Sequence, residues 1–403
     1  MVFTDFYVIS HAQKIHLTLT VFMKKSLLSL AIVTFALGIT EFGMMGILED
    51  VALGLGISNV QAGHFITAYS VGVAVGAPML IVLRRWPLRR LLLALVAIML
   101  VGNLSASCSP GYVTLLISRF FSGLPHGAFF GAAAIVAERL VPAGRKATAV
   151  AVVVGGMSVA NVVGVPLATF LANVLSWRCA FVSVALCALV ALWAIRRYVP
   201  VLAPLPDTGL KGQFRFLAVP GPWLVYAGVF FGQMSVYCWL SYIAPMMTQV
   251  THFPPADLTW IMIVVGLGMV VGNGVSGKLS DRYPAALVTG VLALSLLVIM
   301  PCIYFCSAMK VPTVILAFLA PAALFGIGGP LQYLIVRYAK GGEMLGGAGI
   351  QIAFNVSNAL AAWIGGVAIH LGYGYASPAL VGLPFALIGA IALLVLYRKY
   401  NLD

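Results

Sequence analysis

The feature that most constrains this sequence is a series of long apolar runs separated by short polar stretches. About 20 apolar residues in an α-helix are enough to cross the hydrocarbon core of a bilayer. Only 8% of the residues are charged, whereas a soluble domain has roughly 25%. We therefore predict an all-α membrane protein with twelve transmembrane helices, at residues 26–48, 62–83, 88–107, 112–137, 147–172, 179–195, 222–248, 258–277, 285–307, 312–338, 344–370 and 377–397.

The charges between these runs predict the orientation of the chain. With the amino end in the cytoplasm, nearly all of the 23 basic residues fall in cytoplasmic segments, and the outer loops hold only Arg178 and Lys310. Cytoplasmic loops of membrane proteins carry an excess of Lys and Arg. We therefore expect both termini in the cytoplasm. The net charge of +13 is then a sign of topology, so nucleic acid is not an expected partner.

The longest loop divides the spans into two sets of six. Residues 196–221 are rich in proline and basic residues, which is typical of a linker. The triplet Arg85-Trp86-Pro87 after the second span is echoed by Arg282-Tyr283-Pro284 after the eighth. We predict a flexible extension at 1–22 and two pseudo-symmetric six-helix bundles at 23–198 and 221–403, joined by a cytoplasmic linker at 199–220. Transporters built from repeats place their substrate site between the halves.

Two charged residues fall well inside apolar runs, Glu41 in the first span and Arg119 in the fourth. At ~1.5 Å per residue, each lies ~10 Å from the outer edge of its span. A charge within the membrane costs at least ~2.5 kcal/mol, so each needs protein or water around it. Opposite charges at matched depth are expected to pair or to share water. The pair is interpreted either as a proton-carrying carboxylate that responds to Arg119 or as a static ion pair.

Small residues spaced four apart predict close helix packing in the fourth and fifth spans. Gly123 and Gly127 follow Arg119 in the fourth span, and Gly156 and Gly164 lie in the fifth. Pro166 then invites a bend. The stripe in the fifth span is interpreted either as a sealed interface that controls alternation or as generic packing.

Uncharged polar residues share helix faces in the carboxyl half. Gln233 and Tyr237 are one turn apart in the seventh span, as are Gln351 and Asn355 in the eleventh. Amides and aromatic hydroxyls suit a neutral polar or amphipathic ligand, so these four residues are our candidates for the substrate cavity. Interhelical hydrogen bonding is the alternative, and we favour it for Asn358.

The histidines and cysteines do not form a recognisable metal site. His64, His126 and His370 have no partners at ligand spacing, so we expect packed or interfacial histidines and no metal. His126 shares nearly the same helix face as Arg119. The six cysteines form no CxxC pair and are interpreted as small buried residues.

Several segments resemble motifs of the major facilitator superfamily, and in particular of its twelve-span drug:proton antiporter group. They are Gly277-x-x-x-Asp281-Arg282, Arg119-x-x-x-Gly123, residues 156–166, Ser176-Trp177-Arg178 with Phe181, and Thr40-Glu41-Phe42-Gly43. The resemblance extends from Met23 to the carboxyl end. The amino-half copy of the loop motif is degenerate, because Arg84 stands where the family usually has aspartate and is followed by Arg85. Glu138 is a candidate for the missing acid.

The resemblance implies proton-driven export by alternating access. Glu41 would be the membrane acid, and Arg119 the motif arginine tied to proton coupling. Antiporter-helix and gating positions would be Gly156, Gly164, Pro166, Arg85, Gly277, Asp281 and Arg282. In the expected cycle, a proton from outside binds Glu41 and displaces its contact with Arg119. The gating loop could instead be a solvated turn.

We therefore expect a monomeric, multi-pass transporter of a bacterial inner membrane. It would export a small neutral or amphipathic solute, such as a sugar or sugar derivative, using the proton gradient and no cofactor. A proton-coupled importer or facilitator of sugars or nucleosides is one alternative, and a receptor or scaffold that does not transport is another. The sequence shows no nucleophile–base pair, metal cluster or phosphate loop, so an enzyme is not expected.

Overall fold

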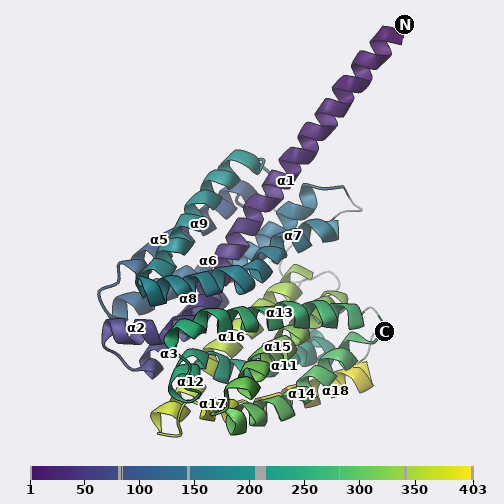
Figure 1. Cartoon of the computed structure of the whole chain (residues 1–403). Helices are drawn as coiled ribbons and strands as arrows, with labels where there is room; N and C mark the ends of the chain where they lie inside the picture. The colour runs from purple at the N-terminus through teal and green to yellow at the C-terminus, as the bar shows by residue number, and fades with distance from the viewer. Residues whose placement is uncertain are drawn as a thin grey trace.

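The structure, a computed structural model, describes residues 2–79, 83, 85–142, 146–204, 215–280, 282–339 and 343–400. It describes side chains for the same residues apart from 2–22, 146–148, 150–151 and 343–344. This part of the chain consists of helices and their connections, without a strand. The helices form two groups, purple to teal and green to yellow in Figure 1. The predicted all-α membrane architecture is confirmed.

The first group forms the amino-terminal half. Its helices are α1 (Val2–Gly46), α2 (Leu48–Leu55), α3 (Asn59–Gly76), α5 (Leu88–Ser107), α6 (Tyr112–Arg139), α7 (Lys146–Val159), the π-helical turn η2 (Ala160–Gly164), α8 (Val165–Val174) and α9 (Trp177–Tyr198).

The second group forms the carboxyl-terminal half. It comprises η3 (Arg215–Ala218), α11 (Pro220–Leu240), α12 (Ile243–Gln249), η4 (Pro255–Asp257), α13 (Leu258–Ser280), α14 (Ala285–Cys306), α15 (Lys310–Tyr338), α16 (Glu343–His370), α17 (Ser377–Val381) and α18 (Leu383–Tyr400).

Eleven segments of the described chain are long and apolar enough to cross a membrane, and they coincide with eleven of the predicted spans. The remaining predicted span, 62–83, overlaps α3, which has 18 residues and begins earlier, at Asn59. That span continues through residues 80–82, which lie outside the described residues. The count of twelve is therefore approximately consistent with the structure.

The first helix begins well before the predicted first span. α1 runs from Val2 to Gly46, and its amino end projects away from the bundle in Figure 1. Residues 2–22 contain neither glycine nor proline, the usual interruptions of a helix. The division expected at residue 22 is therefore not a break in secondary structure.

The fifth span is irregular where the sequence predicts a bend. α7 passes into the π-helical turn η2 and then into α8, with Pro166 immediately beyond the turn. Proline lacks the backbone N–H that would complete the α-helical ladder, and single π-turns absorb such an interruption. The helix therefore continues through the membrane with one widened turn.

Hydrogen bonds join the two halves at the end that the basic residues assign to the outside. Asn59 Nδ2 donates to the Tyr375 hydroxyl at 2.9 Å, and Asn173 Nδ2 donates to the Pro255 carbonyl at 3.0 Å. Below them, α3 packs beside α16, and α8 packs beside α13. These contacts hold the outer ends of the halves together in this structure.

Candidate functional site

The site begins with a close approach of α3 and α6. A Cβ atom added at Gly123 would collide with the carbonyl oxygen of Tyr69, and one at Gly72 would collide with that of Phe120. The helix backbones therefore touch, as the glycine spacing predicts. This contact places the preceding turn of α6, which carries Arg119, directly against α3.

Arg119 is fully buried between α6 and its neighbours. Its Nε donates to the Phe65 carbonyl at 3.3 Å, and its guanidinium carbon lies 4.5 Å from the centre of the Tyr69 ring. A guanidinium over an aromatic face is stabilised by the negative face of the ring. Its Nη1 and Nη2 find no hydrogen-bond partner among the described residues. The Arg119 guanidinium is therefore held by one hydrogen bond from Nε and by its contact with the Tyr69 ring, and its two Nη groups remain unpaired among the described residues.

Glu41 on α1 is also buried, with 2% of its surface exposed. Its Oε2 lies 3.8 Å from His126 Nε2, and its Oε1 has no partner within the described part of the chain. The other ring nitrogen of His126, Nδ1, lies 2.8 Å from the Tyr69 hydroxyl. Phe130 stacks on the imidazole, with ring centres 5.2 Å apart. Glu41, His126, Tyr69 and Arg119 thus form one continuous buried cluster.

Glu41 and Arg119, which were expected either to pair or to share water, do not form a direct ion pair among the described side chains. Among the described side chains, the nitrogen at ion-pair distance from Glu41 belongs to His126 and not to Arg119. Counting residues along a helix gives the depth of a side chain, but it does not give the direction in which that side chain points across the bundle. Arg119 turns toward α3, where the Phe65 carbonyl and Tyr69 ring are within reach. Its charge still influences the Glu41 carboxylate through space.

His126 is absent from the site predicted from the sequence. Without partners at metal-ligand spacing, it is indistinguishable there from a packed histidine. The available signal was its position on the same face of α6 as Arg119. Tyr69 carried no such signal, since it comes from another helix.

The glycines of the fifth span pack against α1. A Cβ at Gly156 would collide with the Ala31 carbonyl oxygen, and one at Gly164 would approach the Ile39 side chain to 2.5 Å. Thr34 on α1 donates its hydroxyl to the Val153 carbonyl across the same contact. The predicted stripe of small residues in the fifth span therefore packs directly against α1, the helix that carries Glu41.

The four candidates for the substrate cavity lie on α11 and α16, which pack side by side. Gln233, Tyr237 and Asn355 are buried, and Gln351 is half-buried. Gln233 Nε2 donates weakly to the Leu324 carbonyl at 3.4 Å, and Asn355 Nδ2 donates to the Gln351 carbonyl at 3.0 Å. The remaining acceptors of these amides and the Tyr237 hydroxyl have no partner among the described residues. Both polar atoms of nearby Asn358 are also unpaired.

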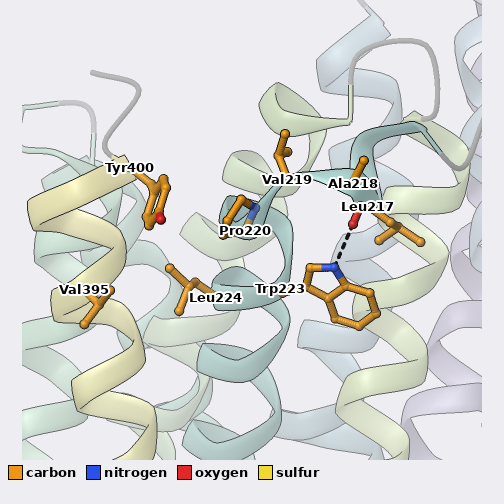
Figure 2. Close-up of a pocket in the computed structure, with 8 residues that line it drawn as sticks. All are labelled: Leu217, Ala218, Val219, Pro220, Trp223, Leu224, Val395 and Tyr400. Carbon is orange, nitrogen blue, oxygen red and sulfur yellow. Dashed lines mark hydrogen bonds between the residues drawn. The ribbon is translucent and has the colours of Figure 1, made fainter.

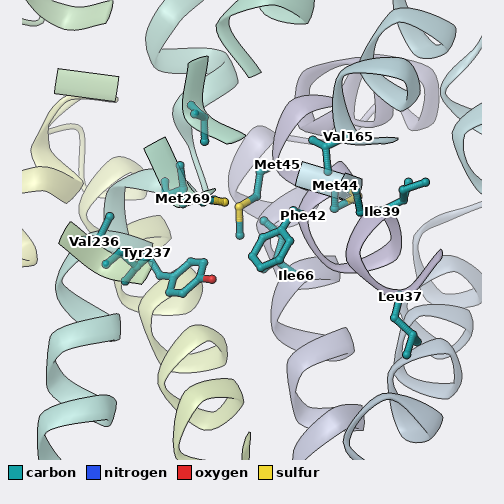
Figure 3. Packing of buried hydrophobic residues seen from close by; sticks show 14 of the residues in the cluster. Leu37, Ile39, Phe42, Met44, Met45, Ile66, Val165, Val236, Tyr237 and Met269 are labelled. Atoms are coloured by element: carbon teal, nitrogen blue, oxygen red, sulfur yellow. The ribbon is translucent and has the colours of Figure 1, made fainter. Parts of the chain in front are cut away.

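Methionine and aromatic side chains fill the junction between the halves beside Glu41. Figure 3 shows Phe42 and Met45 of α1 facing Met269 and Tyr237 of the carboxyl half. The rings of Phe42 and Phe325 meet edge to face with centres 5.7 Å apart. Methionine adapts its shape easily, so such a junction can repack without large gaps. Phe42, the residue after Glu41, therefore contacts the carboxyl half directly.

At the outer end, Glu49 of α2 binds α12. Its Oε2 accepts from the Thr248 hydroxyl and its Oε1 accepts from Gln249 Nε2, both at 2.7 Å. Burial and then the neighbouring Glu49 carboxylate raise the pKa of Asp50 from 3.8 to about 6. This contact could not be predicted, because nothing in a single sequence relates residues so far apart.

The predicted gating loops are only partly visible. Gly277 and Arg282 are exposed at the cytoplasmic end of α13, and Arg85 is exposed in the corresponding loop of the amino half. Asp281 and Arg84 lie outside the described residues. Their gating role therefore stays a prediction.

A groove of about 450 Å³ lies apart from this cluster, at the cytoplasmic ends of α11 and α18 (Figure 2). Trp223, whose Nε1 donates to the Leu217 carbonyl at 2.9 Å, forms one wall, and Tyr400 and Val395 form the other. The lining residues carry no charge. The groove therefore lacks the carboxylate, histidine or basic side chain that a proton-coupling site requires.

Comparisons with known proteins agree with this architecture. The sequence model of the Major Facilitator Superfamily matches residues 30–346 of this chain. The chain is 42% identical over 382 residues to AraJ of Escherichia coli strain K12, covering 94% of this chain and 96% of AraJ. It is 35% identical over 374 residues to the inner membrane transport protein YdhP of the same strain, covering 93% and 95%. A crystal structure of a D-xylose–proton symporter superposes with a TM-score of 0.76, at 16% identity, over 94% of this chain and 98% of that one.

Proposed function

The chain belongs to the Major Facilitator Superfamily of membrane transporters, and on that premise we propose that it exports a small neutral or amphipathic solute in exchange for protons. The proposed solute class is a sugar or sugar derivative, and the proposed location is a bacterial inner membrane. A relative named as an inner membrane transport protein supports this location. The protein acts as a monomer, with the proton gradient as its energy source.

The buried carboxylate of Glu41 is the observation that carries this proposal. It is the acid that the described residues enclose most fully, and one of its oxygens has no partner among them. An ionisable group inside the membrane is costly, so it is retained where its charge is used. When the Glu41 carboxylate binds a proton it becomes neutral, and the free-energy cost of burying its charge disappears.

Proton binding changes the charge of the cluster. With Glu41 ionised, its negative charge offsets the positive charge of Arg119 nearby. With Glu41 neutral, the guanidinium charge is no longer balanced. Such a change favours a different packing of α1, and Phe42 transmits it to Phe325 in the other half. Exchange requires only that the proton and the solute favour different conformations of the same protein.

The carboxyl half supplies the polar surface proposed for the solute. The unpaired acceptors of Gln233 and Asn355 and the hydroxyl of Tyr237 are neutral groups. Buried polar atoms without a partner are rare in native proteins, and a ligand that bonds to them accounts for their retention. Hydroxyl groups of a solute can donate to the amide oxygens and can bond to the Tyr237 hydroxyl. An ionic solute would lack a counter-charge on this surface.

Transport into inside-out membrane vesicles tests the proposal. A thermal-stability screen of the purified protein against sugars, nucleosides and lipophilic cations first selects the solute. Export predicts uptake into inside-out vesicles that is stimulated when the vesicle lumen is acidic and lost when a protonophore removes the gradient. Uptake confined to right-side-out vesicles would indicate an importer, and uptake independent of the gradient would indicate a facilitator. Absence of counterflow for every stabilising solute would favour a receptor or scaffold.

A further inference from the structure

His126 has a different partner on each of its two ring nitrogens. Nδ1 lies 2.8 Å from the Tyr69 hydroxyl, and Nε2 lies 3.8 Å from Glu41 Oε2. An imidazole between a hydroxyl and a carboxylate can carry its proton on either nitrogen, and the hydrogen bond at one nitrogen decides what the other can do. The ring is 2% exposed and stacks on Phe130, so its orientation is fixed.

A second histidine in the same half provides an internal comparison. His64 Nδ1 lies 2.7 Å from the Tyr112 hydroxyl, and its ring meets that of Tyr112 edge to face, as the ring of His126 meets that of Tyr69. The described residues place no carboxylate at ion-pair distance from His64. The two histidine–tyrosine pairs therefore differ in the presence of Glu41 and in burial, since His64 and Tyr112 are only half-buried.

We propose that His126 and Glu41 share the transported proton, and that Tyr69 positions the imidazole for this exchange. The inference rests on the proposed proton coupling and deepens it. When Glu41 is protonated and His126 carries its hydrogen on Nδ1, Nδ1–H donates to the Tyr69 oxygen and the lone pair of Nε2 faces Glu41. Glu41 first moves from 3.8 Å to hydrogen-bond distance of Nε2, and the proton then passes from Oε2 to Nε2.

This transfer balances in atoms and charge. The O–H bond of Glu41 breaks and an N–H bond forms at Nε2, which leaves a carboxylate and an imidazolium. The total charge of the pair does not change, so no net charge is created inside the membrane. The imidazolium afterwards gives one proton to water once the cluster opens to the cytoplasm, and a neutral imidazole remains beside the carboxylate.

The other ionisable groups around the pair favour sharing over a permanent imidazolium. Arg119 on the same helix opposes a positive charge on His126, and the Glu41 carboxylate of α1 supports one. Tyr69 of α3 contributes a neutral hydroxyl. Tyr237 of α11 points its hydroxyl toward α1 across the junction in Figure 3. A positive imidazole is therefore favoured only when Glu41 is ionised, which couples the two protonation states.

Two spectroscopic titrations of the purified protein in lipid vesicles test this inference without a known solute. Infrared difference spectroscopy follows the protonated carboxyl band that Glu41→Gln removes. Nitrogen NMR follows the imidazole signals that His126→Gln removes. Sharing predicts that both signals change over the same pH range, and that His126→Gln moves the midpoint of the carboxyl band by about one pH unit or more. Tyr69→Phe is expected to move it in the same experiment, whereas His64→Gln leaves it in place.

The outcomes separate this inference from the proposed function. A Glu41 band that titrates while the His126 nitrogens stay unchanged would overturn the shared proton and leave Glu41 as the carrier. The absence of any titrating Glu41 band would contradict the proposed function itself. If His126→Gln fails to fold, the wild-type nitrogen signals and the Tyr69→Phe midpoint still decide the question.

Discussion

The Glu49 carboxylate accepts a hydrogen bond of 2.7 Å from the Thr248 hydroxyl, which joins two residues 199 positions apart at the outer ends of the two halves. Gln249 donates to the other carboxylate oxygen at the same distance. Hydrogen bonds to a charged group are stronger than neutral ones. This pair of bonds closes the outer end of the molecule in the conformation described here.

The first prediction concerns this outer contact. Glu49→Ala and Thr248→Val each remove the same bond, so their effects on stability should not add. We expect a coupling of about 1 kcal/mol between them, from thermal unfolding in detergent as a double-mutant cycle. Asp257→Ala, at a half-buried acid of η4, serves as a control and should add to either change. Additive effects of Glu49→Ala and Thr248→Val would show that the bond does not hold the halves together.

The second prediction concerns pH and Asp50. Burial and Glu49 raise the pKa of Asp50 to about 6 in the folded protein, above its usual 3.8. A raised pKa means that the folded state binds a proton more tightly than the unfolded state, so Asp50 opposes folding at pH 7 and ceases to do so as the pH falls below about 4. Asp50→Asn should therefore stabilise the protein at pH 7 by about 1 kcal/mol, after allowance for solvent screening.

The measurement for Asp50 is the difference between the unfolding midpoints of the wild type and Asp50→Asn, taken at several pH values. The difference should be largest above pH 6 and disappear near pH 4. Taking the difference removes the contributions of all other titrating groups. A variant that gains stability equally at every pH would contradict the raised pKa.

The third prediction compares two adjacent glycines of the fifth span. A Cβ at Gly156 would collide with the Ala31 carbonyl oxygen, whereas one at Gly155 would meet nothing within 4 Å. Gly156→Ala should push α7 away from α1, lowering the unfolding temperature and the transport rate. Gly155→Ala should be neutral or stabilising, because alanine favours helix by up to ~1 kcal/mol. Equal behaviour of the two variants would argue against close packing at Gly156.

The fourth prediction compares two buried tyrosines of the carboxyl half. The Tyr242 hydroxyl donates to the Ala362 carbonyl at 2.8 Å, whereas the Tyr237 hydroxyl has no partner in the described part of the chain. Tyr242→Phe should cost about 1 kcal/mol of stability. Tyr237→Phe should cost none and should instead raise the KM for the solute. Loss of stability with an unchanged KM in Tyr237→Phe would remove that residue from the proposed cavity.

Hydropathy and the position of the longest loop were sufficient to predict eleven of the membrane-spanning helices and their division into two groups. Glycine spacing also predicted which faces pack, as Gly123 against α3 and Gly156 against α1 demonstrate. These features depend on residues close together in one helix. They can therefore be obtained from a single sequence.

The partners of the buried charges could not be predicted in the same way. Counting along the helices gave Glu41 and Arg119 the same depth, but their neighbours depend on how each helix is rotated. The partners Tyr69 and Phe65 come from α3, and the Glu49 contact joins the two halves. Such contacts follow from tertiary packing, which one sequence does not specify.

Proton movement driven by a solute gradient tests the central claim most directly. Wild-type protein and Glu41→Gln are reconstituted into vesicles containing a pH indicator, with Asp257→Asn, at a half-buried acid of η4 outside the cluster, as the matched control. We predict that solute addition changes the internal pH with the wild type and Asp257→Asn. Glu41→Gln should retain solute exchange without moving protons. Proton movement of undiminished size in Glu41→Gln would contradict the assignment of this buried carboxylate as the proton carrier.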